Sequence, residues 1–365
     1  MNIIKYRLML VMGYLGAVIG AGFASGQEIV QFFVSYGAYG LKGALLATVL
    51  FAVCGGGLLY VAHSIKASNY QSILTNLFGK QIAKVVDMLL AIFLFLGIST
   101  MLSASGAVFY EHLYLPKNAG ILLAYTLVML MLLRGKKGLI FSYNILVPVK
   151  LLLLLLISGY AAVFVKGTQV ETYTAFLHPA EAKYWVISAI LYVAYNFSLA
   201  MVVLTEYQNI TGRKDSIWGA VWGGLILGLL VTLNYIALSK FLPTVLHYQV
   251  PMLYVAGKIS ITAKHIYTLV LWVGILTTAL ANAYGITQRL SSLSGINYKL
   301  SLMICMTLAL PVSMQSFSML VTRIYPVFGI LGVLILVALI YRAIIELGKE
   351  MINELIQYIR KTREV

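Results

Sequence analysis

Residues 13–28, with the sequence GYLGAVIGAGFASGQE, decide the fold. Within this apolar stretch stand five closely spaced glycines, Gly13, Gly16, Gly20, Gly22 and Gly26. A glycine inside a helix costs about 1 kcal/mol relative to alanine. One interpretation is packing, because Gly16–Gly20 and Gly22–Gly26 are small-xxx-small pairs that bring membrane helices together. Two such pairs, followed by Ser25, Gln27 and Glu28, favour the other interpretation, an unwound helix whose backbone amides are open to a ligand.

The composition around this stretch is that of a membrane protein. Of the 365 residues, 61% are hydrophobic and 10% are charged, whereas soluble domains carry about 45–50% and about 25%. The net charge of +15 does not indicate a nucleic-acid binder, because the Lys and Arg residues lie between apolar blocks. The five histidines lie near the ends of these blocks, which disfavours an enzyme with a buried general base. Cys54 and Cys305 lie inside apolar blocks and predict neither a disulfide framework nor a metal site.

Ten apolar segments are long enough to cross a bilayer, for which about 20 helical residues suffice. With the N-terminus inside, most of the 26 Lys and Arg residues fall on the cytoplasmic side, so both termini are expected in the cytoplasm of a multi-pass cell-membrane protein. The segments cover 7–35, 40–65, 82–110, 118–134, 138–165, 184–208, 216–239, 265–289, 299–317 and 319–342.

These segments divide into two halves of five spans, 7–165 and 184–342, followed by a cytoplasmic amphipathic helix or tail over 343–365. Five is an odd number, so the second half enters the membrane from the opposite side. Inverted repeats of this kind place a binding site at the midplane between discontinuous helices. The sequence therefore predicts an all-α polytopic membrane protein of about ten transmembrane helices. We expect a 5+5 inverted repeat whose first helix is interrupted within 19–26 and whose sixth is interrupted within 193–200.

The sixth span carries polar side chains in the middle of its apolar run, at Tyr195, Asn196 and Ser198. Such groups need partners in hydrocarbon. They either hold the bundle together by interhelical hydrogen bonds or line a binding site.

The two interrupted spans resemble the amino acid–polyamine–organocation superfamily, which has the leucine-transporter fold. Gly20-Ala21-Gly22-Phe23 is similar to its glycine-rich first-helix break. In the sixth span, Asn196-Phe197 stands where that superfamily has Gly-Phe, Glu206 fits its acidic position, and Asn209 is followed by Ile210 rather than proline. The run 20–31 also resembles the YkvI type of bacterial membrane protein.

Lys150 lies in the middle of the fifth span, where a lysine costs at least ~2.5 kcal/mol and must face acceptors inside the protein. It matches the lysine that sodium-independent members carry in place of a sodium ion, next to helix-one carbonyls and helix-eight hydroxyls. The resemblance gives the coupling site as Lys150 with Gly16, Ile19, Gly274, Thr277 and Thr278, and Na⁺ is the competing occupant. The alternatives are a structural lysine and threonines that bond their own helix.

The resemblance implies binding of a zwitterion, with its carboxylate at the half-helix that begins near Gly22–Gly26 and its ammonium at helix-six carbonyls. No charged residue is expected among the pocket residues, which favours a neutral substrate. Glu28 and Glu206 are candidate proton or vestibule residues. The predicted substrate-binding residues are Gly20, Ala21, Gly22, Phe23, Ser25, Gly26, Ser99, Ser103, Tyr195, Asn196, Phe197 and Ser198.

The sequence thus predicts a secondary active transporter of a small neutral amino acid or related amine. It needs no cofactor, and its partners are that small-molecule substrate and the lipid bilayer. It would work by alternating access, as an exchanger or with H⁺ as coupling ion. Two alternatives remain open, a Na⁺-coupled amino acid symporter and a nutrient-sensing receptor on the same fold.

Overall fold

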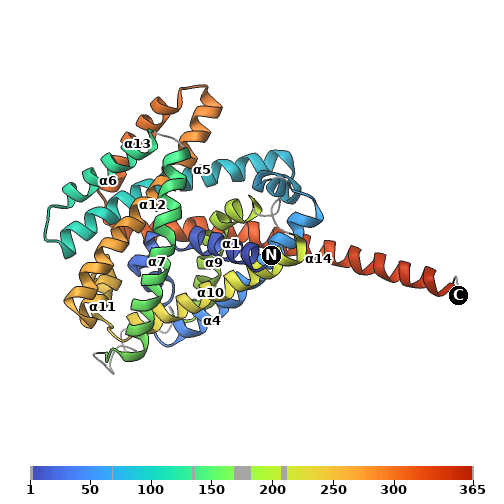
Figure 1. Cartoon of the computed structure of the whole chain (residues 1–365), viewed down its shortest axis with the longest axis horizontal. Coiled ribbons are helices and arrows are strands. Elements are labelled where there is room, and N and C mark those ends of the chain that lie inside the picture. The colour runs from blue at the N-terminus through green and yellow to red at the C-terminus, as the bar shows by residue number, and fades with distance from the viewer. Residues whose placement is uncertain (1–2, 68, 134–135, 168–181, 207–211, 364–365) are drawn as a thin grey trace.

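The computed structural model describes residues 3–67, 69–133, 136–167, 182–206 and 212–363 (Figure 1). Within these ranges, the side chains of 3–6, 136–147, 206 and 354–363 lie outside the description. Every regular element in the described residues is a helix.

Ten apolar helices account for the ten predicted spans. Six are long and apolar enough to cross a membrane, and four shorter apolar helices cover Arg7–Val18, Lys117–Leu132, Pro148–Phe164 and Tyr298–Ser313 of the described residues. The helices are α1 (Ile3–Val18), α4 (Tyr39–Ser64), α5 (Tyr70–His112), α6 (Lys117–Leu132), α7 (Lys136–Phe164), α9 (Trp185–Glu206), α10 (Arg213–Ser239), α12 (Ile261–Ser294), α13 (Tyr298–Ser313) and α14 (Phe317–Arg363). Between α10 and α12 lie two short elements, η4 (Thr244–His247) and α11 (Pro251–Ile259).

The helix contacts have the symmetry of an inverted repeat. If each of spans one to five is exchanged with its equivalent among spans six to ten, the same helix pairs are found in contact. α4 packs against α10, α5 against α12, and α1 against α9, and each of these pairs maps onto itself in the exchange. The α1–α10 contact has its counterpart in α9–α4, α7–α10 in α14–α4, and α7–α12 in α14–α5. The boundaries 7–165 and 184–342 remain a prediction.

Small residues bring α4 and α10 into close contact. A Cβ atom at Gly224 would overlap the backbone at Ala52, and one at Gly228 would overlap the Thr48 side chain. Tyr14 of α1 is fastened to the same pair, since its hydroxyl donates to the Phe51 carbonyl at 2.9 Å. The first span is therefore held against α4 and α10 below its break.

The first span is interrupted twice, which confirms the expected discontinuity in helix one. α1 ends at Val18, and Gly20 is extended (φ −86°, ψ −171°) before α2 (Ala21–Ser25) begins. Gly26 then adopts φ +83°, a conformation that favours glycine, and α3 (Gln27–Phe32) follows. The half-helix expected to begin near Gly22–Gly26 is divided by this second glycine break into α2 and α3.

The sixth span is not interrupted, so the expected break within 193–200 is wrong. α9 runs as one helix over Trp185–Glu206. Asn196 Nδ2 donates to the Tyr192 carbonyl at 3.1 Å, and Ser198 Oγ donates to the Ala194 carbonyl at 2.8 Å. These bonds satisfy the polar side chains inside the helix. Without glycine or proline in this stretch, nothing favours an opened backbone.

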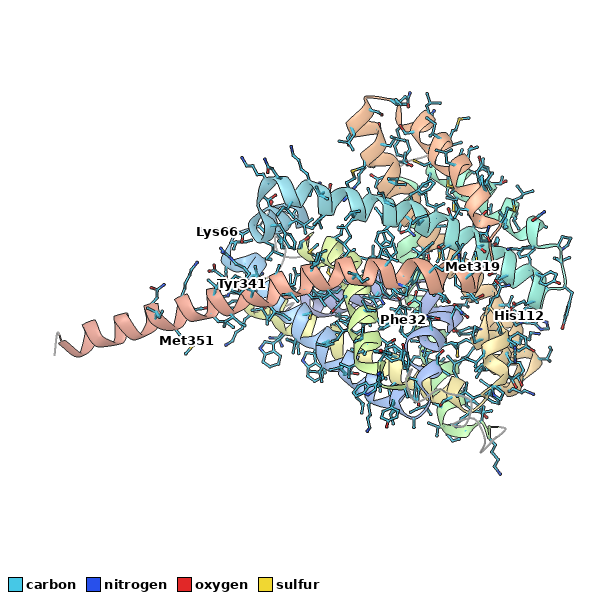
Figure 2. All side chains as sticks on the ribbon, turned by 180° about the vertical axis from the view of Figure 1, so that it is seen from behind. Phe32, Lys66, His112, Met319, Tyr341 and Met351 are labelled. Carbon is cyan, nitrogen blue, oxygen red and sulfur yellow. The ribbon has the colours of Figure 1, made fainter. Side chains whose placement is uncertain are left out.

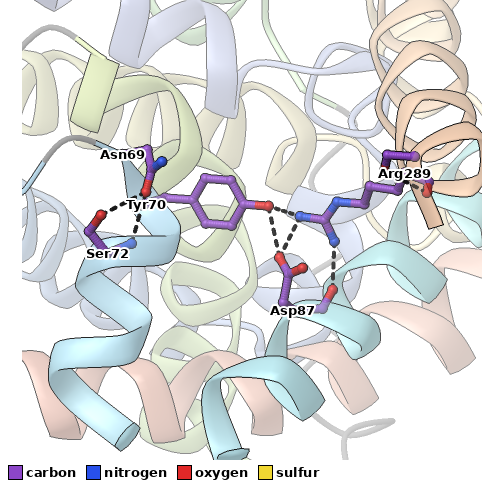
Figure 3. Close-up of polar contacts among 6 residues, drawn as sticks. Asn69, Tyr70, Ser72, Asp87 and Arg289 are labelled. Atoms are coloured by element: carbon purple, nitrogen blue, oxygen red, sulfur yellow. Dashed lines mark hydrogen bonds and ion pairs between the residues drawn. The ribbon is translucent and has the colours of Figure 1, made fainter. Parts of the chain in front are cut away.

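A polar cluster joins α5 to α12 (Figure 3). α5 is kinked at Gly79 (φ +76°), and Tyr70 and Asp87 lie on either side of the kink. The Tyr70 hydroxyl donates to Asp87 Oδ1 at 2.8 Å. Arg289 of α12 donates to both the Asp87 carboxylate and the Asp87 backbone carbonyl, each at 2.6 Å. The cluster fixes the angle of the kink and its distance from α12.

The last span and the predicted tail form one helix. α14 runs along the bundle past Met319 and Tyr341, and its end beyond Met351 projects away from the other helices (Figure 2). Before it leaves the bundle, Glu350 pairs with Arg213 of α10 at 2.6 Å and accepts from the Tyr60 hydroxyl of α4 at 2.7 Å. The tail is therefore an extension of the tenth span.

Candidate functional site

A cavity of about 50 Å³ lies at the first break of helix one. At about 10–15 Å³ per water, it has room for on the order of four waters. Seven segments contribute to its lining: α1 with the following break, α2, α3, α5, α9, α12 and α14. Its lining residues are Ala17, Val18, Gly20, Ala21, Gly22, Glu28, Phe93, Leu94, Gly97, Met101, Tyr195, Asn196, Leu199, Thr278, Asn282 and Tyr325.

The structure brings together part of the predicted site at this cavity. The predicted residues that line it are Gly20, Ala21, Gly22, Glu28, Tyr195, Asn196 and Thr278. Glu206 is the last residue of α9, and its side chain lies outside the described residues, as does Asn209.

Glu28 is the unexpected member of this group, since no charged residue was expected in the pocket. Its side chain is 4% exposed and folds back onto α2. A Cβ atom at Gly22 would overlap the Glu28 carboxyl group. The sequence could not show this, because only the turn at Gly26 reverses the chain enough for Glu28 to reach Gly22.

Aromatic side chains surround the Glu28 carboxyl group. The Glu28 carboxyl group is close enough to Tyr192, Tyr195 and Tyr325 to interact electrostatically with their hydroxyl groups. The rings of Tyr195 and Tyr325 are 4.9 Å apart between centroids, and Phe93 lies 5.9 Å from Tyr325 and 6.3 Å from Tyr195. The rings of Phe93, Tyr195 and Tyr325 come from α5, α9 and α14, and they line the same cavity as Glu28.

Lys150 reaches the same break from α7, beside the cavity. Its side chain is 3% exposed, and its ammonium donates to the Ile19 carbonyl at 2.5 Å. Ile19 is the residue between α1 and Gly20, so its carbonyl is free of the helix. Gly274 of α12 leaves room for the lysine stem, because a Cβ atom there would lie 3.1 Å from Lys150 Cδ. Three of the six predicted coupling residues therefore meet at one point.

Thr277 and Thr278 follow the pattern of threonines that bond their own helix. Both hydroxyls donate to the Gly274 carbonyl, at 2.8 Å and 3.0 Å. Thr278 also lines the cavity, and its Oγ1 would lie 3.5 Å from a Cβ atom at Gly20. Among the described contacts, Gly16 has none with Lys150.

Ser25 and Gly26 serve the turn between α2 and α3. Ser25 Oγ donates to the Gly22 carbonyl at 2.8 Å and accepts from the Gln27 amide at 3.2 Å. A Cβ atom at Gly26 would lie 2.8 Å from Met252 Cγ of α11. Neither residue lines the cavity, so they shape the backbone that carries Glu28.

Five further predicted pocket residues lie elsewhere, one of which is Ser198 with its bond to the Ala194 carbonyl of α9. Ser103 donates to the Gln315 carbonyl at 2.6 Å, which places it at the turn between α13 and α14. Ser99 is fully buried on α5, and its hydroxyl has no hydrogen-bond partner among the described residues. Phe23 and Phe197 are fully buried but do not line the cavity.

The sequence interpretation missed several lining residues. Asn282 follows Thr278 by four residues on α12, so helical spacing alone places both on one face. Phe93 and Gly97 are related in the same way on α5. Tyr325 of α14 carries no comparable signal, because it reaches the cavity only through helix packing. In the described part of the chain, no group of three or more His, Cys, Asp or Glu side chains could hold a metal ion.

Two proteins of Bacillus subtilis (strain 168) are similar to the chain over nearly its whole length. The membrane protein YkvI is 30% identical over 334 residues, which cover 91% of this chain and 94% of YkvI. The protein YyaD is 27% identical over 348 residues, which cover 94% and 98% of the two chains. No family model matches the chain.

Solved transporter structures share the fold. MhsT, solved in complex with L-phenylalanine, has a TM-score of 0.62 and 16% identity, and the match covers 93% of this chain and 88% of MhsT. A manganese transporter of Eremococcus coleocola, in complex with an aromatic bis-isothiourea substituted compound, has a TM-score of 0.60 and 12% identity over 90% of this chain and 76% of that one. The chain therefore has the leucine-transporter fold, and its identity with YkvI shows that it belongs to the YkvI family of multi-pass membrane proteins.

Proposed function

We propose that the chain is a secondary active transporter of a small neutral amino acid or related amine, working by alternating access. The observation that carries the proposal is the cavity at the break of helix one. Most of its lining residues are buried, including Tyr195 and Glu28. A solute reaches such a site from either side only when helices move apart, which is the transport cycle of this architecture.

The lining supports an organic solute. It combines the amides of Asn196 and Asn282 with the hydroxyls of Tyr195, Tyr325 and Thr278. Few convergent polar groups in an otherwise apolar wall are typical of small-molecule sites. The complex of MhsT with L-phenylalanine supports an amino acid or a related compound on this fold.

We further propose that transport is independent of sodium, because Lys150 holds the cation position at the Ile19 carbonyl. Two unit charges about 4 Å apart repel each other by about 4 kcal/mol at an effective dielectric constant of about 20. A sodium ion beside the ammonium is therefore disfavoured. Coupling would then proceed by exchange of substrates or by proton symport. From the Lys and Arg distribution we place both termini in the cytoplasm.

Uptake into proteoliposomes tests the proposed function. The reconstituted chain should accumulate labelled alanine or a small labelled amine in exchange for unlabelled substrate inside. Uptake should be equal in sodium, potassium and choline buffers. A nutrient-sensing receptor would bind the same solutes without moving label, and a sodium-coupled symporter would lose uptake in potassium and choline.

A further inference from the structure

We propose that the ligand of this cavity is a small primary amine in its ammonium form, bound by the Glu28 carboxylate, rather than an amino acid zwitterion. The inference rests on the proposed function, because it names the substrate class of the same cavity. It rests on three features of Glu28: the position of its carboxyl group, its lack of a cationic partner and the rings around it.

The Glu28 carboxyl group stands where a substrate carboxylate was expected. A Cβ atom at Gly22 would overlap it, so the space beside Gly22 is already occupied by a carboxyl group of the protein. A second carboxylate in the same site would be disfavoured, because two carboxylates at close range do not both stay ionised. The protein therefore provides the negative group that a zwitterion would otherwise bring.

This carboxylate has no cationic partner in the described part of the chain. The described ion pairs within 4.0 Å involve Asp87, Glu111, Asp215, Glu346 and Glu350, and none of them involves Glu28. Glu28 Oε2 is buried and has no hydrogen-bond partner among the described residues. A buried carboxylate is costly without a charged or hydrogen-bonding partner. An ammonium ligand supplies both.

The walls of the cavity suit an ammonium group. The rings of Tyr195, Tyr325 and Phe93 lie within 6.3 Å of each other, and all three residues line the cavity with Glu28. Aromatic faces attract cations, and cages of such rings are a recurring way to bind organic ammonium ions. The Tyr195 hydroxyl is buried beside the Glu28 carboxyl group, so its oxygen can accept a hydrogen bond from an ammonium group held by Glu28.

The size of the cavity points in the same direction. About 50 Å³ accommodates a few heavy atoms. Ethylamine and alanine form a matched pair of probes, because alanine is ethylamine with a carboxylate added at the carbon that bears nitrogen. If Glu28 occupies the anion position, the added carboxylate weakens binding rather than strengthening it.

The test is ligand binding to the purified full chain, with ethylamine, alanine and propionate as probes and thermal stabilisation as the readout. We expect ethylamine to bind on the order of tenfold more tightly than alanine, and propionate not to bind. Glu28→Gln should weaken ethylamine binding on the order of tenfold, with no loss for alanine. Glu111→Gln is the matched control, since Glu111 is a half-buried carboxylate that accepts from the Gln249 amide outside this cavity.

Tighter binding of alanine by the wild type, equal binding of ethylamine by Glu28→Gln, or failure of ethylamine to bind at all would each overturn the inference. If Glu28→Gln does not fold, the comparison of ethylamine with alanine in the wild type still decides it. Uptake separates this inference from the proposed function. Ethylamine uptake that is unchanged in Glu28→Gln contradicts the amine site alone, whereas Glu28-dependent ethylamine binding without uptake contradicts transport alone.

Discussion

The first and sixth spans occupy equivalent places in the two halves, yet one is broken twice and the other is continuous. The first span has Gly20 in an extended conformation and Gly26 at positive φ, and the chain between them forms only α2. The sixth span has Asn196 and Ser198 at its centre, and both donate to carbonyls of α9 itself. Glycine opens the backbone in one half, and polar side chains that bond their own helix leave it intact in the other.

The two spans therefore contribute different groups to the cavity. The first provides open backbone, including the Ile19 carbonyl that accepts from Lys150, and the Glu28 side chain brought back by the turn. The sixth provides only side chains, chiefly Tyr195 and Asn196. In this protein only the first span offers open backbone carbonyls and amides to the cavity, because the sixth span is a continuous helix. Substitutions at each span should show this difference.

The largest effect is expected for Gly22→Leu. A side chain at this position would occupy the space of the Glu28 carboxyl group and push it into the cavity. Overpacking costs about 1–3 kcal/mol, which corresponds to a loss of binding of up to about 100-fold. Ligand affinity of the purified variant, measured by thermal shift, checks this.

Gly159→Leu is the matched control, because a Cβ atom at Gly159 of α7 meets nothing within 4 Å. It should fold and bind as the wild type does. Normal binding by Gly22→Leu would mean that the glycines of the first span serve packing alone and that the site lies elsewhere.

Lys150→Ala should have the next largest effect. It leaves the Ile19 carbonyl buried without its donor, which costs about 1–3 kcal/mol, so uptake is expected to fall by about tenfold or more. Any uptake that remains should become responsive to sodium, because the cavity then offers oxygens to a cation. Uptake in sodium and choline buffers measures both effects.

Lys240→Ala is the matched control for Lys150→Ala, because it also removes a lysine that donates to backbone carbonyls. Lys240 donates to the carbonyls of Ala161, Ala162 and Val165 at 2.7–3.2 Å, near the end of α7 and away from the cavity. Its removal should lower the thermal stability without making uptake responsive to sodium. Strong sodium dependence of the wild type would contradict the role proposed for Lys150.

Much of the fold follows from the sequence because hydrophobic length is a local property. The ten spans appear where the apolar blocks lie, and the break in helix one appears where the glycines cluster. The break expected in helix six followed from the inverted repeat and from the polar side chains in the middle of the span, which has no glycine or proline there. The interhelical hydrogen bonds considered for Asn196 and Ser198 are not what the structure has either, because both side chains donate to carbonyls of α9 itself.

The site was only partly predictable because much of it is made by packing. Lys150 could be found from its cost in mid-membrane, and it does reach the break. Ser103 could not be excluded, since its Gln315 partner lies 212 positions away in the chain. Tyr325 could not be predicted as a lining residue either, because α14 is brought to the cavity only by helix packing. Periodicity shows which face of a helix is polar, but not which other helix that face meets.

A smaller effect is expected for Asn196→Ala in the sixth span. One N–H of the Asn196 amide is engaged by the Tyr192 carbonyl, so its oxygen and its second N–H are the groups it can offer to a ligand in the cavity. One hydrogen bond contributes about 0.5–1.5 kcal/mol, so affinity should fall by about fivefold. Asn234→Ala is the matched control, because Asn234 makes the same type of bond to Leu230 on α10 but does not line the cavity. Equal affinity in both variants would contradict a contribution of the sixth span through this side chain.

The smallest effect is expected for Ser198→Ala. Among the described contacts, the Ser198 hydroxyl bonds only the Ala194 carbonyl of its own helix, and that carbonyl belongs to an uninterrupted α9. Affinity should change by less than about twofold, and thermal stability should change little, since such back-bonding does not strengthen a helix. Ser188→Ala on the same helix is the contrast, because Ser188 donates to the Phe32 carbonyl at the end of α3 and joins two spans. It should lower the unfolding temperature while Ser198→Ala does not. If Ser198→Ala instead abolished binding, the sixth span would have to open around Ser198 when the ligand binds, and the difference between the two spans would belong to the empty protein alone.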